Sequence, residues 1–162
     1  MPWFRRPESA SLVPLAPEDD PGDSPDALRA AIAAVVRLIN SSAGRLPLRA
    51  VVAARRITDV LTEIVDTSEV RPLDVYAVIS VRSTATDYLP TTVRSFLAVD
   101  ETLVDVPRPS GRTPVASLME QLDALEDSAT AVLKAAQEQD VDALMTQGSF
   151  LRTKFSGSDL DL

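Results

Sequence analysis

Four polar residues close to a proline are the best candidates for chemistry in this sequence. They are Arg82, Asp87, Tyr88 and Arg94, on either side of Pro90. An arginine can hold an anion through paired hydrogen bonds, and a tyrosine hydroxyl can donate a proton. In the simpler interpretation, the aspartate caps a helix, the tyrosine packs in the core and both arginines face solvent. We favour this simpler interpretation, and we keep Tyr88 and Arg94 as candidates for contact with a partner.

The remaining residues exclude several kinds of catalytic and metal site. The chain has no His and no Cys, so the commonest general base, thiol nucleophiles and thiolate metal ligands are missing. Neighbouring carboxylates such as Glu126 and Asp127 lack the glutamate and histidine partners that metal-binding bundles place on facing helices. No glycine-rich phosphate loop or serine nucleophile motif is present. We therefore predict no enzyme activity, no catalytic residue, no metal and no cofactor.

The charge of the chain limits the class of partner. Its formal net charge is -8, whereas a nucleic-acid-binding protein normally presents a clustered cationic face. We predict no nucleic-acid partner. A short basic stretch contains Arg45, Arg49, Arg55 and Arg56. Acidic residues at helical spacing, such as Asp59 four positions after Arg55, offset these charges, so we interpret the stretch as a solvated helix face.

The N-terminal segment is rich in proline and in acidic residues. Such a segment buries too little apolar surface to order itself, so we predict that residues 1–23 form a disordered acidic tether. Near its tip are four side chains that can anchor in a partner groove or at a membrane surface, Trp3, Phe4, Arg5 and Arg6. An ordinary frayed start is the alternative. The apolar runs are too short for a transmembrane helix, and we expect a cytoplasmic protein with at most peripheral membrane contact.

Capping residues mark the first two helices. Ser24 followed by Pro25 predicts a helix start, because serine accepts hydrogen bonds from free amides and proline suits the first helical position. An apolar stripe at steps of three and four then continues to Ile39. Pro47 begins a second segment with the same spacing, which ends near Ser68. These two segments are predicted to be amphipathic helices.

A third apolar segment opens at Pro72 and contains Pro90. Residues Val75 to Val81 are rich in β-branched side chains, but no second strand-like segment exists to pair with them, so we prefer a helix. A proline costs about 3 kcal/mol in a helix interior and little in a first turn. We therefore predict an elbow at which Asp87 caps a new helix and residues 91–99 run back.

The clearest helical pattern lies in the C-terminal part. Thr113 and Pro114 repeat the start signal, and apolar residues at heptad spacing form a seam from Val115 to Ala136. Asp140 can cap a further helix, which predicts an antiparallel hairpin. The seam can be buried within this hairpin or between two copies of the chain. We favour the intramolecular arrangement and keep self-association through the seam as the alternative.

Together these elements predict an all-α fold. We expect a helical bundle of about five helices over residues 24–155, with a proline elbow and a long C-terminal helical hairpin, followed by a flexible acidic tail at residues 156–162. Without a catalytic constellation, the expected role is that of a non-enzymatic interaction or scaffold protein that binds another protein. The alternative is a carrier or sensor that holds a small apolar ligand between its helices.

The segment from Tyr88 to Leu97, "YLPTTVRSFL", resembles a motif of the 5-bromo-4-chloroindolyl phosphate hydrolysis (XpaC-type) protein family. In that family a proline follows Tyr-Leu, and a leucine-rich helix follows Thr-Thr. The resemblance implies an α-helical protein with a function linked to the envelope or to toxic-anion stress. It implies no catalytic residue that can be placed on this sequence.

Overall fold

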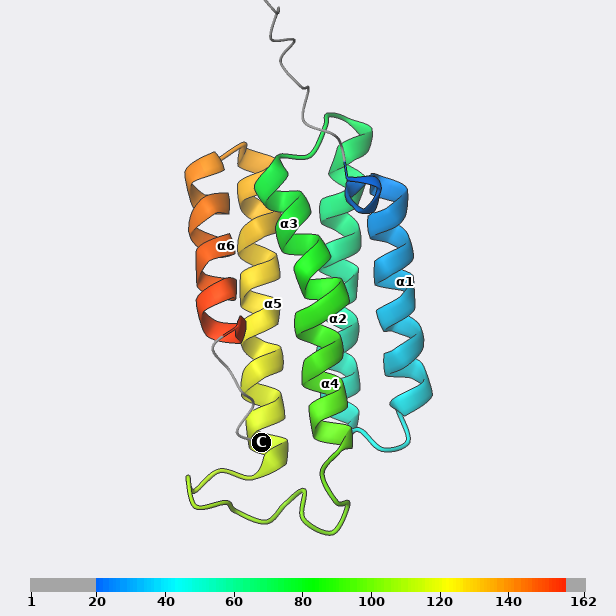
Figure 1. The fold of residues 1–162 in the computed structure, drawn as a ribbon, viewed down its shortest axis with the longest axis vertical. Coiled ribbons are helices and arrows are strands. Elements are labelled where there is room, and N and C mark those ends of the chain that lie inside the picture. Colours follow the sequence, from blue (N-terminus) through cyan, green and yellow to red (C-terminus); the bar gives the residue numbers. More distant parts are fainter. Residues whose placement is uncertain (1–19, 157–162) are drawn as a thin grey trace, which may run out of the picture.

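The computed structural model describes residues 20–156, which form an all-helical bundle (Figure 1). The α-helices are α1 (Pro25–Ser42), α2 (Leu48–Asp66), α3 (Val75–Ser83), α4 (Leu89–Leu97), α5 (Pro114–Glu138) and α6 (Val141–Ser156). Two short 3-10 turns are η1 (Pro21–Asp23) and η2 (Thr67–Glu69), and the π-helical segment η3 (Thr84–Tyr88) joins α3 to α4. The predicted all-α class is confirmed, since these described residues contain no strand.

Side-chain caps fix several of the helix starts. Ser24 and Thr113 each accept a hydrogen bond from the amide three residues ahead, at 3.2 Å and 3.1 Å. Both precede a proline at the first helical position, as predicted. The carboxylate of Asp74 accepts from the amide two residues ahead at 2.8 Å. The third helix therefore begins at Val75, later than the predicted start at Pro72.

Helices α2 and α5 form the inner pair of the bundle. They pack directly on each other, with α1 beside α2 and α6 beside α5. We use the name rod for α3, η3 and α4 together. The rod crosses the inner pair between α1 and α6 and contacts all four helices (Figure 1). In Figure 1, α2 and α5 both run upward, whereas α1, the rod and α6 run downward.

The core is aliphatic, and the seam of α5 is buried in it. The buried seam residues pack against α2, against the rod and against α6 within the same chain. They include Val115, Leu118, Leu122, Leu125, Ala129 and Val132. Helices α5 and α6 form the predicted hairpin, in which Gln139 adopts a left-handed φ of 59° and Asp140 caps α6 at 3.0 Å. Within residues 20–156, no helix is long and apolar enough to cross a membrane.

The predicted elbow at Pro90 is wrong. The rod continues from α3 through η3 into α4 without a break (Figure 1). Asp87 does not cap a new helix, and its carboxylate instead accepts from the hydroxyl of Thr91 at 3.2 Å. The turn before the proline is widened, since the amide of Leu89 donates to the carbonyl of Thr84, five residues back.

This wider turn accommodates the proline. In an α-helix, residue 90 would donate to the carbonyl four residues earlier, and the proline ring would collide with that carbonyl. A π-turn changes the spacing of the preceding carbonyls and so relieves the collision. Ala85, Leu89 and Val93 are all buried, so the core-facing side of the rod is continuous through η3. Packing along the whole rod outweighs a local cost of about 3 kcal/mol.

The folded part begins before the predicted boundary at residue 24. Asp20 caps η1 by accepting from the amide of Gly22 at 3.0 Å. Arg82 of α3 donates to the carboxylates of Asp20 and Asp23, at 3.0 Å and 2.7 Å. Residues 20–23 therefore belong to the bundle and not to the tether. The rest of the predicted tether, with Trp3, Phe4, Arg5 and Arg6, lies outside the described residues, as does the tail after residue 156.

Truncation of a seam residue tests the assignment of the core. Leu122 is 1% exposed, so Leu122→Ala should lower the free energy of unfolding by about 2–5 kcal/mol through lost contacts and a cavity. The matched control is Leu103→Ala, at a side chain that is 52% exposed, and it should change this free energy by less than about 0.5 kcal/mol. Urea unfolding followed by circular dichroism measures both. Equal losses in the two variants would contradict this core.

Candidate functional site

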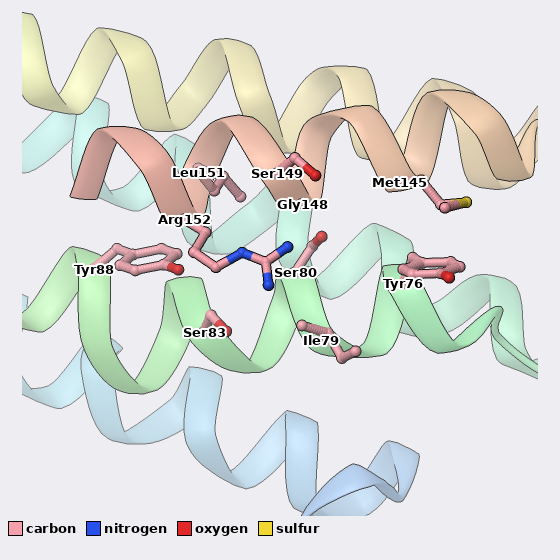
Figure 2. Close-up of a pocket in the computed structure, with 10 residues that line it drawn as sticks. All are labelled: Tyr76, Ile79, Ser80, Ser83, Tyr88, Met145, Gly148, Ser149, Leu151 and Arg152. Carbon is pink, nitrogen blue, oxygen red and sulfur yellow. The ribbon is translucent and has the colours of Figure 1, made fainter. Parts of the chain in front are cut away.

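A groove lies between the rod and α6, and we call it the α3–α6 groove. Its volume is about 400 Å³, within the range of about 300–1,000 Å³ usual for small-molecule sites. Figure 2 shows the side chains that line it, which combine apolar groups, phenols, hydroxyls and one guanidinium. They are Tyr76, Ile79, Ser80, Ser83, Tyr88, Met145, Gly148, Ser149, Leu151 and Arg152.

Helical spacing explains one wall of the groove, and the π-helical segment completes it. Tyr76, Ile79 and Ser83 follow one another on α3 at steps of three and four, so they share a face. Tyr88 comes five residues after Ser83. In a regular α-helix, Asp87, four residues after Ser83, would lie closest to that face. The wider turn of η3 brings Tyr88 to the groove in its place.

Tyr88 also holds the end of α6. Its ring stacks on that of Phe155, with 5.3 Å between the ring centroids and an angle of 28° between the planes. Offset stacking of this kind contributes about 0.5–1.5 kcal/mol beyond the apolar area that it buries. The aromatic pair closes the groove at the C-terminal end of α6.

Ser80 supplies a hydroxyl inside the groove that has no hydrogen-bond partner within residues 20–156. The residue is 4% exposed, and its Oγ accepts or donates no hydrogen bond among the described residues. Leaving a buried hydroxyl unsatisfied costs about 1–3 kcal/mol. In Figure 2, this hydroxyl points from α3 toward α6, where Gly148 lies.

Gly148 leaves a space opposite this hydroxyl. A Cβ atom added to Gly148 would lie 4.0 Å from Ser80 Oγ, its nearest neighbour, which is an ordinary van der Waals contact. Close packing therefore does not require a glycine. In a helix interior, glycine is less favourable than alanine by about 1 kcal/mol. The missing side chain leaves the groove open above the hydroxyl of Ser80.

Arg152 adds a positive charge at the edge of the groove. Its side chain extends from α6 across the groove, and the guanidinium points toward Ser80 (Figure 2). None of the lining residues is a carboxylate, and the chain has no His or Cys. None of the lining side chains is therefore a usual general base for the hydroxyls of the groove. Within residues 20–156, no cluster of acidic side chains could hold a metal ion. This arrangement is suited to binding through apolar contacts and hydrogen bonds.

The four polar residues that we considered as a possible site near Pro90 lie on different sides of the rod. Arg82 is held by the aspartates of η1, and Asp87 pairs with the next turn of the rod. Tyr88 lines the α3–α6 groove, whereas Arg94 lies beside α1, in a separate shallow cavity. Among the described candidates for partner contact, only Tyr88 therefore belongs to the groove.

Sequence analysis missed Ser80, Gly148 and Arg152. The available signal was the glycine, because a glycine within an otherwise helical pattern has a cost that calls for a packing or functional reason. Ser80 carried no such signal, since a serine in an apolar helix is often satisfied by its own backbone.

Comparisons with protein-family models, with curated proteins and with solved structures found no match. The resemblance of residues 88–97 to the XpaC-type family therefore stays a prediction.

Two buried serines provide a test of the unsatisfied hydroxyl. Ser80→Ala should leave the free energy of unfolding unchanged or raise it by about 1 kcal/mol, because it removes a polar group without a partner. Ser128 is buried as well, but its hydroxyl donates to Gln147 Oε1 at 3.1 Å. Ser128→Ala should lower the free energy of unfolding by about 1 kcal/mol. Urea unfolding measures the free energy of unfolding of both variants. A larger loss for Ser80→Ala than for Ser128→Ala would mean that the hydroxyl of Ser80 has a hydrogen-bond partner.

Proposed function

We propose that this chain is a non-enzymatic binding protein that holds a small, largely apolar ligand in the α3–α6 groove. The observation that carries the proposal is the juxtaposition of Ser80 and Gly148. A buried hydroxyl that has no partner among the described residues lies opposite a space left by a helix glycine. The unsatisfied hydroxyl lowers the stability of the ligand-free protein by about 1–3 kcal/mol. The helix glycine lowers it by about 1 kcal/mol. A ligand that fills the space and bonds to Ser80 would offset both losses.

The other side chains of the groove support a ligand with an apolar body. Ile79, Leu151 and Met145 offer aliphatic and thioether surface, and methionine adapts its shape readily to a bound molecule. Tyr76 and Tyr88 add aromatic surface with a polar hydroxyl. A few polar groups in a mostly apolar wall are typical of sites that fix the orientation of a small molecule. A carrier or a sensor would use the groove in this way.

A neutral apolar dye, N-phenyl-1-naphthylamine, tests whether the groove binds ligands. The fluorescence of the dye should rise saturably, with one dye bound per chain. Gly148→Leu places a side chain over Ser80 and should weaken the binding at least about tenfold, or about 1.4 kcal/mol. The helix itself should tolerate the change, because leucine is a better helix former than glycine.

The matched control is Gly44→Leu, at a glycine in the turn after α1 where an added Cβ meets no atom within 4 Å. It should bind the dye as the wild type does. Equal binding by all three proteins would place the dye elsewhere, and no binding by the wild type would contradict an accessible apolar groove.

A second candidate function is the interaction or scaffold role predicted from the sequence. The observation that favours it is an apolar strip on the outer side of α2 and α5, where Leu48 is 79% and Val52 is 48% exposed. These side chains border a broad depression of about 770 Å³. Exposed apolar groups that gather beside a depression, with charged groups around them, are typical of surfaces that bind proteins. The proposed link to envelope or stress functions rests on the XpaC-type resemblance alone.

Affinity capture from cell lysate tests the interaction role. Immobilised wild-type protein should retain a partner in a fixed molar ratio, and Val52→Glu should abolish this capture by placing a charge on the apolar strip. The matched control is Val75→Glu at the start of α3, where the side chain is similarly exposed. If both variants capture the partner equally well, the interaction involves another surface.

A further inference from the structure

The outer side of α2 and α5 carries opposite charges on its two helices. We call this surface the α2–α5 face. Arg49 and Arg56 project from α2, and Asp123 and Glu126 from α5. The apolar strip lies beside these charges, and Leu48 and Val52 of α2 and Met119 of α5 contribute to it. Two arginines of α2 thus lie beside two acids of α5, next to exposed apolar groups.

Most charged side chains of this face make no close ion pair within the described residues. Among residues 20–156, the only ion pair between these arginines and acids joins Arg56 Nη1 to Glu126 Oε1 at 3.8 Å. This distance is too long for a hydrogen bond. Arg49 and Asp123 make no ion pair or side-chain hydrogen bond with the described residues. Charged groups of both signs therefore remain available beside exposed apolar side chains.

This pattern favours a second copy of the chain over other occupants. The chain as a whole carries a formal net charge of -8, so two copies repel each other wherever acidic surfaces meet. The depression on the α2–α5 face is an exception, because the two arginines that line it balance its two acids. A nucleic acid or a strongly basic partner would match only one of the two helices. An identical face matches both of them.

Symmetry makes this match geometrically simple. Helices α2 and α5 run in the same direction (Figure 1). Two copies can face each other across a two-fold axis that runs parallel to these helices. This axis places α2 of each copy opposite α5 of the other, and every residue keeps its height along the helix direction. The arginines of each copy then face the acids of the other, and the apolar strips cover each other.

We propose that the chain forms a symmetric homodimer through the α2–α5 face. Arg49 of one copy lies near Asp123 of the other, and Leu48 and Val52 cover Met119 of the opposite copy. This inference rests on the interaction role proposed above and is independent of the α3–α6 groove. It names the partner as the chain itself.

Sedimentation equilibrium of the purified full chain tests the dimer. The wild type should approach twice the chain mass of 17.4 kDa as its concentration rises through the micromolar range. Val52→Glu should weaken association at least about tenfold, while Val75→Glu should associate as the wild type does. Circular dichroism confirms that each variant is folded.

Charge exchange tests which helices meet. Arg49→Glu and Asp123→Arg should each weaken the homodimer, since each opposes two like charges. Mixing these two variants should restore association. In the mixed dimer, the introduced glutamate of one copy faces the introduced arginine of the other, and the native Arg49 and Asp123 face each other at the second contact. Salt should weaken the wild-type and mixed dimers alike.

A wild type that stays monomeric up to millimolar concentration would overturn the homodimer. If such a monomer still captured a different protein in a manner dependent on Val52, the interaction role would stand while the homodimer failed. A wild-type dimer that Val52→Glu leaves intact, or single charge variants that do not recover on mixing, would show that the copies do not meet through this face.

Discussion

The missing backbone N–H of Pro90 is the constraint on which the arrangement of the groove depends. The rod crosses the bundle in contact with four helices, so a break at the proline would expose a continuous buried face. The chain instead widens the preceding turn, with Leu89 donating to the carbonyl of Thr84. That turn carries Tyr88 onto the side that faces α6, where it stacks on Phe155. A backbone solution to one proline thus fixes one end of the α3–α6 groove.

The contacts of α6 differ along its two sides. On the side toward α5, the buried Ser128 donates a hydrogen bond to the side chain of Gln147. Toward α3, the hydroxyl of Ser80 has no partner in the described part of the chain, and Gly148 offers no side chain. Natural sequences usually agree with their structures at every level, and local departures from that agreement tend to occur at functional positions. Two departures that face each other across one groove are therefore the strongest functional signal in this molecule.

Local chemistry could be predicted from the sequence, whereas distant contacts could not. The caps at Ser24 and Thr113 depend on a few neighbouring residues, so their helix starts were predicted correctly. The elbow was predicted from the intrinsic cost of proline, and tertiary packing on the rod overrode that cost. Arg82 and Asp23, which tie η1 to α3, are 59 positions apart. Ser80 and Gly148 are likewise distant in sequence, and nothing in either local pattern indicates that they face each other.

The π-helical turn also restricts how this chain can change in length during evolution. A five-residue turn contains one residue more than the α-helical turn that it replaces, so η3 is equivalent to a single insertion in a regular helix. Because the wider turn absorbs this extra residue, deleting one residue from η3 would restore an α-helical turn and leave the facing of α4 nearly unchanged. The deletion would, however, bring back the collision between the proline ring and the carbonyl four residues earlier. Chains descended from a common ancestor would therefore keep the extra residue wherever they keep the proline.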